Sequence, residues 1–227
     1  MAKKLTRKEL LKGSDEFLTF SERAVLFVRE HIRHFQYIGL GAVVLVLVYL
    51  GGNAYLKHVN KKAQETYNQA YSVLVENVNG GAEQDAASKA MALFREVIDD
   101  HGLSSVSRLA FPELAYLKFQ DKKFDEAIPL YQKFLSDVPE NSPYGSLARL
   151  AIAACHEEMG NWAVAEQSLK EIVSMRDDFF KEQAMLSLAR VYRLSEQDEK
   201  SKEVLNELIE KYKNSPFTPL AQAYLAR

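Results

Sequence analysis

The longest apolar run in the chain, residues 35–55, contains no charged residue. A helix of these 21 residues would be about 30 Å long, which is the thickness of the hydrocarbon core of a bilayer. Tyr37 and Tyr55 lie near its two ends, where aromatic rings favour the membrane interface. The pattern therefore predicts a transmembrane helix over residues 35–56.

Two other interpretations of this run remain open. One is a buried core helix, although such a helix in a soluble protein seldom lacks a polar stripe. The other is a cleavable signal peptide, because Gly52, Asn53 and Ala54 offer the small-x-small spacing of a cleavage site. The 34 residues before the run exceed an ordinary n-region, which favours an uncleaved anchor.

Residues 1–34 form a basic tail whose last part has helical spacing. Ser21 is a suitable N-cap, and Val25, Val28 and Ile32 fall on one face of the helix that would follow. This helix would either lie along the lipid headgroups or extend the membrane helix into water. The residues expected at the membrane interface are Arg23, Arg29, Arg33, Tyr37, Tyr55 and Lys57.

The charges on the two sides of the run predict its orientation. Residues 1–56 carry eight Lys or Arg and five Asp or Glu, whereas residues 57–227 carry 21 and 26. Because short basic segments stay on the cytoplasmic side, we expect a cytoplasmic N-terminus with residues 57–227 outside. The basic residues nearest the run are balanced on its two sides. An organelle receptor whose repeats face the cytosol therefore stays open.

Beyond the run, the chain repeats itself. Residues 142–148, SPYGSLA, return at 215–221 as SPFTPLA, 73 residues later, or about two periods of a 34-to-38-residue unit. The abundance of Ala, Leu, Glu and Lys and the lack of strand alternation predict an all-α fold. Small residues recur in pairs twelve positions apart: Ala115 and Ala127, Ala153 and Ala165, Ala189 and Ser201.

Residues 111–139, FPELAYLKFQDKKFDEAIPLYQKFLSDVP, resemble the tetratricopeptide repeat. The resemblance is strong over 111–141, moderate over 146–178 and 182–214, and weak over 62–103. It implies a right-handed solenoid of about four helical pairs over residues 57–227, with the small pairs at helix crossings. Phe124 and Trp162 match the aromatic residue of the turn between helices. The sequence departs from the repeat at Lys118 and His156, where an aromatic is usual, and at Asp177, where a proline is usual.

Catalytic chemistry finds little support in the sequence. A formal net charge of −2 argues against a nucleic-acid partner, which would need a basic face. The histidines lack the spacing of a zinc site, and His156 next to Cys155 points about 100° away on a helix. We expect no enzyme, no catalytic residue, no metal, no cofactor and no small-molecule substrate.

A protein-binding groove is the remaining hypothesis. In tetratricopeptide arrays the first helix of each pair lines the concave face, and we expect Tyr116 and Phe119 to anchor a bound peptide there. The alternative is that these positions are ordinary solvated ones. The expected groove residues are Tyr116, Phe119, Gln120, Glu157, Glu158, Arg190 and Arg193.

One membrane span followed by a divergent repeat domain resembles the bacterial family that includes the YfgM-like ancillary subunit of the SecYEG translocon. That resemblance implies a single-pass inner-membrane protein with a periplasmic domain that contacts chaperones. We therefore expect a membrane-anchored protein–protein interaction module that recruits partners at a translocon or an envelope assembly machine. The alternative is a structural scaffold subunit with permanent contacts and no exchanging peptide.

Overall fold

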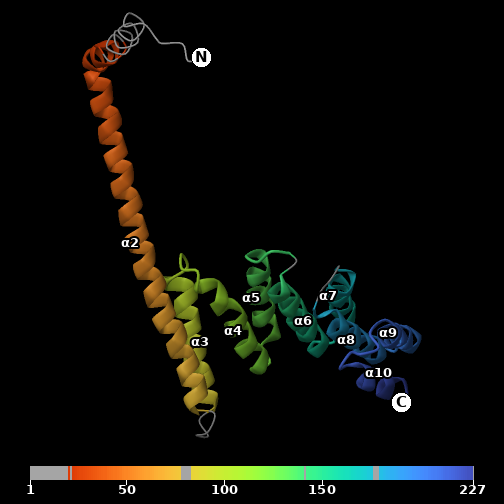
Figure 1. Cartoon of the computed structure of the whole chain (residues 1–227). Coiled ribbons are helices and arrows are strands. Elements are labelled where there is room, and N and C mark those ends of the chain that lie inside the picture. The colour runs from red at the N-terminus through yellow and green to blue at the C-terminus, as the bar shows by residue number, and fades with distance from the viewer. Residues whose placement is uncertain (1–19, 21, 78–82, 141, 176–178, 227) are drawn as a thin grey trace, which may run out of the picture. The chain divides into compact units, whose positions relative to one another are not determined.

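Helices are the regular elements of the computed structural model, which describes residues 20, 22–77, 83–140, 142–175 and 179–226 (Figure 1). This confirms the predicted all-α class. The chain divides into two units, Met1–Lys57 and His58–Arg227. The labelled helices are α2 (Ile32–Asn77), α3 (Glu83–Asp100), α4 (Ser107–Gln120), α5 (Phe124–Ser136), α6 (Pro143–Glu158), α7 (Trp162–Ser174), α8 (Lys181–Leu194), α9 (Asp198–Lys211) and α10 (Thr218–Leu225).

In the first unit, residues 22–30 are helical, and a one-residue turn at His31 separates them from α2. The amide of His31 donates to the carbonyl of Phe27 at 3.0 Å, and the amide of Phe35 donates to that of His31 at 3.2 Å. Helical hydrogen bonding therefore continues across the turn. Ser21, the predicted cap, lies outside the described residues.

The predicted membrane run forms part of α2, and its large apolar side chains are exposed. Over Ile32–Val75 this helix is long and apolar enough to cross a membrane, and none of its most apolar window is buried. A core helix of a soluble protein would bury most of such a window. Length and composition alone do not distinguish a membrane span from a signal sequence.

The second unit consists of successive antiparallel helix pairs, α4 with α5, α6 with α7, and α8 with α9. A further pair precedes them, because Tyr67 and Tyr71 of α2 pack edge-on against Phe94 of α3, with ring centroids 5.4 and 5.6 Å apart. The short helix α10 closes the array against α9. The four pairs in the described residues agree with the predicted number. The first pair differs from expectation because its first helix is the C-terminal part of α2, which has no break between the predicted membrane run and the repeat.

The small residues that the sequence pairs twelve positions apart are buried at the crossings within each helix pair. Ala115 and Ala127 are fully buried, and so is Ala165, opposite Ala153. In the α8–α9 pair the hydroxyl of Ser201 donates to the carbonyl of Ala189 at 2.8 Å. A larger side chain would force these backbones apart, and this explains the choice of small residues.

The turn inside each of these pairs has the same backbone conformation. Lys122, Gly160 and Glu196 have φ of 60°, 73° and 59°, in the left-handed region. They follow one another at intervals of 38 and 36 residues, which are the intervals between the crossing alanines. Only the middle turn uses glycine, which adopts this conformation without a Cβ clash. The equivalent turns show that the three pairs are copies of one unit.

One departure from the repeat pattern, Lys118, has a local structural explanation. Lys118 is buried except for its tip, and its Nζ lies 2.7 Å from the Glu126 carboxylate. The equivalent position in the α8–α9 pair is Tyr192, whose hydroxyl donates to the Glu166 carboxylate at 3.1 Å. An ion pair thus occupies the place of an aromatic ring in the second pair. Asp177 lies outside the described residues.

Candidate functional site

A cavity of about 380 Å³ opens between α4 and α6, with α5 forming its floor. We call it the α4–α6 pocket. Two helix pairs contribute to it, so it depends on how neighbouring repeats stack. Its lining residues are Pro112, Glu113, Tyr116, Tyr131, Phe134, Tyr144, Leu147, Ala148 and Ala151.

Tyr116 is the expected groove residue that lies in this pocket. It projects from α4 about 100° around the helix from the buried Ala115, and 51% of it is exposed. The Gln120 amide, one turn later, donates to its hydroxyl at 2.5 Å. The structure therefore brings together two of the expected groove residues, and this hydrogen bond holds the Tyr116 ring in place.

Tyr144 and Leu147 face Tyr116 from α6, and sequence reasoning missed them. They are 66% and 44% exposed, although a large apolar side chain on a soluble helix is usually buried. With Ala151 they form a stripe at i, i+3 and i+7, beside the buried stripe of the same helix that contains Ile152. This second stripe was the sequence signal for the pocket.

Glu113 is the one acidic or basic residue among the residues that line the pocket. It lies near Tyr71 of α2, whose pKa is raised first by burial and then by this carboxylate. Tyr131, in the floor, is nearly fully buried. Burial first, and then the neighbouring Cys155 thiol and Glu113 carboxylate, raise the pKa of Tyr131, so its phenol stays neutral.

Phe119, the second expected anchor, has another environment. Its ring lies edge-on to that of Phe124, with centroids 5.3 Å apart, and both join the core beneath α4, α5 and α6. Phe124 is the turn aromatic of this repeat. Truncating Phe119 would thus loosen the turn between α4 and α5, whatever it does to a ligand.

Three of the four expected charged residues of the groove contact other side chains of the array. Arg190 of α8 forms an ion pair with Glu157 of α6, in which Nε lies 2.8 Å from Oε1. The Arg190 Nη2 also donates a hydrogen bond to Oε2 at 2.9 Å. The Arg193 guanidinium stacks 4.6 Å from the ring centroid of Tyr224 in α10. Glu158 stays exposed. The groove face therefore changes from an open pocket at α4–α6 to a closed ion pair at α6–α8.

Cys155 and His156 do not form a catalytic pair. The thiol is fully buried, and burial raises the pKa of Cys155 to about 11. Burial also lowers the pKa of His156. Such a thiol is a weak nucleophile at neutral pH, because the thiolate is the reactive form. Within the described parts of the chain, no cluster of three or more metal-binding side chains occurs.

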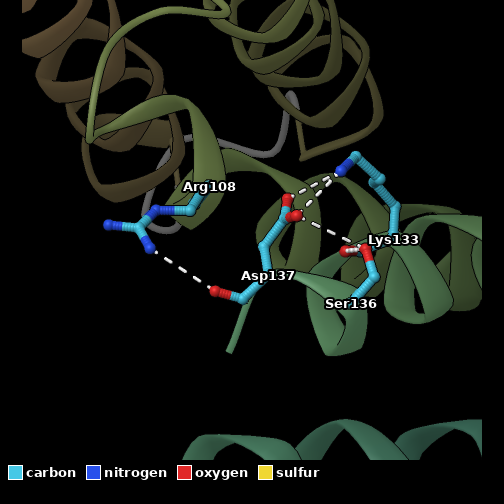
Figure 2. Close-up of polar contacts among 4 residues, drawn as sticks. All are labelled: Arg108, Lys133, Ser136 and Asp137. Atoms are coloured by element: carbon cyan, nitrogen blue, oxygen red, sulfur yellow. Dashed lines mark hydrogen bonds and ion pairs between the residues drawn. The ribbon is translucent and has the colours of Figure 1, made fainter. Parts of the chain in front are cut away.

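Figure 2 shows a charged cluster at the end of α5 that has a structural role. Lys133 Nζ donates to both oxygens of Asp137, at 2.8 and 2.9 Å, and this contact is the main reason that the pKa of Asp137 is low. Arg108 of α4 donates to the Asp137 carbonyl at 3.4 Å. The cluster ties the start of α4 to the C-terminus of α5, where a helix leaves carbonyls unpaired.

The residues expected at a membrane interface are all exposed. Among them, Tyr37 is 72% and Tyr55 is 60% exposed. Arg23, Arg29 and Arg33 lie on residues 22–30 and the start of α2, and Lys57 ends the first unit. These positions permit an interfacial role without testing it.

Comparison with known proteins identifies the fold of the helical array. Residues 183–215, which include most of α8 and all of α9, match the family model of the tetratricopeptide repeat. The nearly identical TPR-like repeats of a candidate kinesin light chain from Podosopora anserina superpose with a TM-score of 0.57 at 16% identity, over 74% of this chain and 85% of that one. The fold is a tetratricopeptide-like array.

A second solved structure has the same architecture. A tetratricopeptide repeat protein from Parabacteroides merdae superposes with a TM-score of 0.55 at 12% identity. That match covers 70% of this chain and 58% of the Parabacteroides protein. No curated protein sequence matches the chain. At these identities the tetratricopeptide-like array shares a fold with its neighbours, and its binding residues have to be argued from its own surface.

Proposed function

We propose that this protein is a membrane-anchored interaction module whose tetratricopeptide-like array binds a partner protein at the α4–α6 pocket. The observation that carries this proposal is the exposure of Tyr116, Tyr144 and Leu147 around one cavity. Ligand pockets usually have volumes of about 300–1,000 Å³ and combine apolar walls with a few polar groups. Exposed aromatic residues at the centre of a surface are the usual anchors of protein interfaces.

The anchoring part of the proposal is supported by the exposed apolar surface of residues 35–55. Contiguous apolar patches beyond a few hundred Å² are rare on soluble proteins. A helix satisfies its own backbone hydrogen bonds, so this surface is compatible with lipid. We place the basic tail in the cytoplasm and the array in the periplasm of a bacterial inner membrane, because short basic segments remain inside.

The resemblance to the YfgM-like translocon subunits suggests where such a module would act. A translocon or an envelope assembly machine would bring unfolded or partly assembled chains past the array. The pocket would then hold one side chain of a partner. We propose binding and not catalysis, because the pocket is lined by one carboxylate, three tyrosines and apolar groups.

A permanent scaffold subunit is the second candidate. A separate cavity of about 440 Å³ lies at the turn between α6 and α7, beside the exposed Val164. Permanent interfaces are larger and more hydrophobic than exchanging ones. If this edge of the array and not the α4–α6 pocket contacts the partner, the scaffold function is correct.

Cysteine labelling in intact cells tests the topology. Ser14→Cys and Ser142→Cys would each add one thiol to the chain, and the buried native Cys155 gives a low background. We expect an impermeant maleimide to label position 142 and not position 14. Labelling of position 14 alone would overturn the orientation. A mature chain that begins after Ala54 would show that the run is a signal peptide.

Site-specific photocrosslinking tests the binding surface. A photoreactive amino acid at Leu147, in the pocket, should yield defined partner adducts in living cells. The matched control is Glu203, an exposed position on α9. Adducts from 147 and not from 203 support the proposal. Adducts at position 164 in place of position 147 would favour the scaffold function.

A further inference from the structure

We propose that the α4–α6 pocket recognises a basic side chain, an arginine or lysine in an exposed segment of the partner, held against Glu113 between the rings of Tyr116 and Tyr144. This inference rests on the proposed function and specifies the chemistry of its ligand. It also predicts which partner segments the array selects.

The first argument is the charge of the pocket. Glu113 is its one acidic or basic lining residue, and among the residues that the structure describes it has no ion-pair partner. An apolar side chain in the pocket would remove this carboxylate from water without replacing its hydrogen bonds, which is costly. An acidic side chain would be repelled. A cation in the pocket would form an ion pair with the carboxylate and so replace the interactions with water that the carboxylate loses.

The second argument is the position of the carboxylate. Glu113 precedes Tyr116 by three residues, so both side chains project from the same face of α4. Burial first, and then the nearby Glu113 carboxylate, raise the pKa of Tyr71 from α2, so these two groups lie close together. The carboxylate therefore lies on the same face of α4 as the Tyr116 ring before any ligand arrives, and this lowers the cost of binding.

The third argument is the aromatic wall. Tyr116 and Tyr144 line the cavity from facing helices, and both are more than half exposed. A cation over the face of a tyrosine ring is attracted by the ring quadrupole. The same preference is satisfied elsewhere in this array, where the Arg193 guanidinium lies 4.6 Å from the Tyr224 centroid. In the α4–α6 pocket the rings are present, and the partner would supply the cation.

We call the surface where the first helices of two neighbouring pairs meet a seam. The α6–α8 seam can be compared with the α4–α6 seam, which contains the pocket. Between α6 and α8, Arg190 of the chain itself forms the charge pair with Glu157 at 2.8 Å. Between α4 and α6, the acidic residue comes from α4 and the opposing α6 residues are Tyr144 and Leu147. At the α6–α8 seam Arg190 pairs with Glu157. At the α4–α6 seam the partner's arginine or lysine would pair with Glu113.

A peptide set with one variable position tests this inference. The full chain, in lipid nanodiscs, is incubated with labelled Gly/Ser/Ala peptides that differ only in a central Arg, Lys, Leu or Glu. We expect the Arg and Lys peptides to bind at least about tenfold more tightly than the Leu and Glu peptides. Glu113→Gln should remove this preference by weakening the binding of the Arg and Lys peptides, whereas Glu113→Lys should favour the Glu peptide.

Two further variants separate recognition from general charge and from folding. Glu203→Gln removes one exposed carboxylate on α9 and should leave the preference intact. Tyr144→Leu keeps an apolar side chain without the ring and should weaken Arg binding severalfold, with the thermal midpoint unchanged. A preference that survives Glu113→Gln, or a stronger binding of the Leu peptide, would overturn the inference and leave the interaction module standing. Failure of the wild type to bind any peptide would overturn both.

Discussion

The α4–α6 and α6–α8 seams share one helix and the same repeat geometry, but they present opposite surfaces. At α6–α8, Glu157 and Arg190 close the groove face with a two-point ion pair. At α4–α6, Tyr116 and Tyr144 stand exposed around a cavity that contains the Glu113 carboxylate. The first seam carries an ion pair formed within the chain, whereas the second leaves two aromatic side chains and one carboxylate around a cavity.

This difference shows that the surface of a repeat array can change from one pair of neighbouring repeats to the next. Stability requires each pair to bury its crossing alanines and its core, and all three equivalent pairs do so. The residues between first helices are free of that requirement, because they lie outside the crossings. One seam can therefore be specialised for binding while its neighbour fixes the angle between repeats.

The largest expected effect on stability concerns Cys155, in the core beneath α4, α5 and α6. Its pKa is about 11 in the folded chain, against an ordinary 9.0. The thiol therefore stabilises the fold fully below pH 9 and loses this contribution as the pH rises toward 11, by at most about 3 kcal/mol. Urea unfolding of wild type and Cys155→Ala at pH 8 and pH 11 measures it. An equal pH slope in both proteins would contradict the prediction.

The second effect separates packing from binding in α4. Phe119→Ala should destabilise the chain by about 2–3 kcal/mol, because it removes a ring packed against Phe124. Tyr116→Ala should cost less than about 1 kcal/mol, because half of that side chain is already in water. Thermal unfolding of the full chain in detergent compares the two. Equal losses would mean that Tyr116 is part of the core and not a binding residue.

The third effect tests the crossings on which both seams depend. Ala115→Leu should overpack the contact between α4 and α5 and destabilise the chain by about 1–3 kcal/mol. Ala163→Leu is the matched control, since Ala163 is exposed on α7 and its enlargement should be nearly neutral. Chemical unfolding monitored by circular dichroism gives both values. A neutral Ala115→Leu would show that the helices cross elsewhere.

The smallest effect concerns the closed seam. The coupling between Glu157→Gln and Arg190→Gln in a double-mutant cycle should be about 0.5–1 kcal/mol, because the Arg190 side chain is 42% exposed and the pair is partly screened. It should fall as salt is added. A coupling near zero would mean that this ion pair does not hold α6 against α8.

Much of the fold was predictable because tetratricopeptide arrays are local. Ala115 and Ala127 lie only twelve residues apart, so their spacing reveals a helix crossing directly. The continuity of α2 was less visible, because residues 58–77 carry the weakest copy of the repeat. There the buried stripe consists of Val59, Ala63 and Ala70, which sequence reasoning gave no weight.

The binding site was only partly predictable, for a related reason. The exposure of Tyr116 on the groove face could be predicted, because Tyr116 lies on the first helix of a pair. Its neighbours on α6 depend on the rotation between successive pairs, and the sequence does not state that angle. The same limit applies to Arg190, which pairs with Glu157 over 33 residues. As single positions these charges suggested contacts with a ligand, but together they form an ion pair.

The central claim is that the open seam, and not the closed one, binds the partner. Affinity purification from the native host, quantified by mass spectrometry, compares wild type with Tyr116→Ala/Tyr144→Ala and with Glu157→Gln/Arg190→Gln. We predict that the first double variant loses at least one partner by about tenfold or more while remaining folded, because truncated aromatic anchors cost several kcal/mol of affinity. The second double variant should retain that partner. Equal recovery from all three proteins, or loss only in the Glu157/Arg190 variant, would contradict the claim.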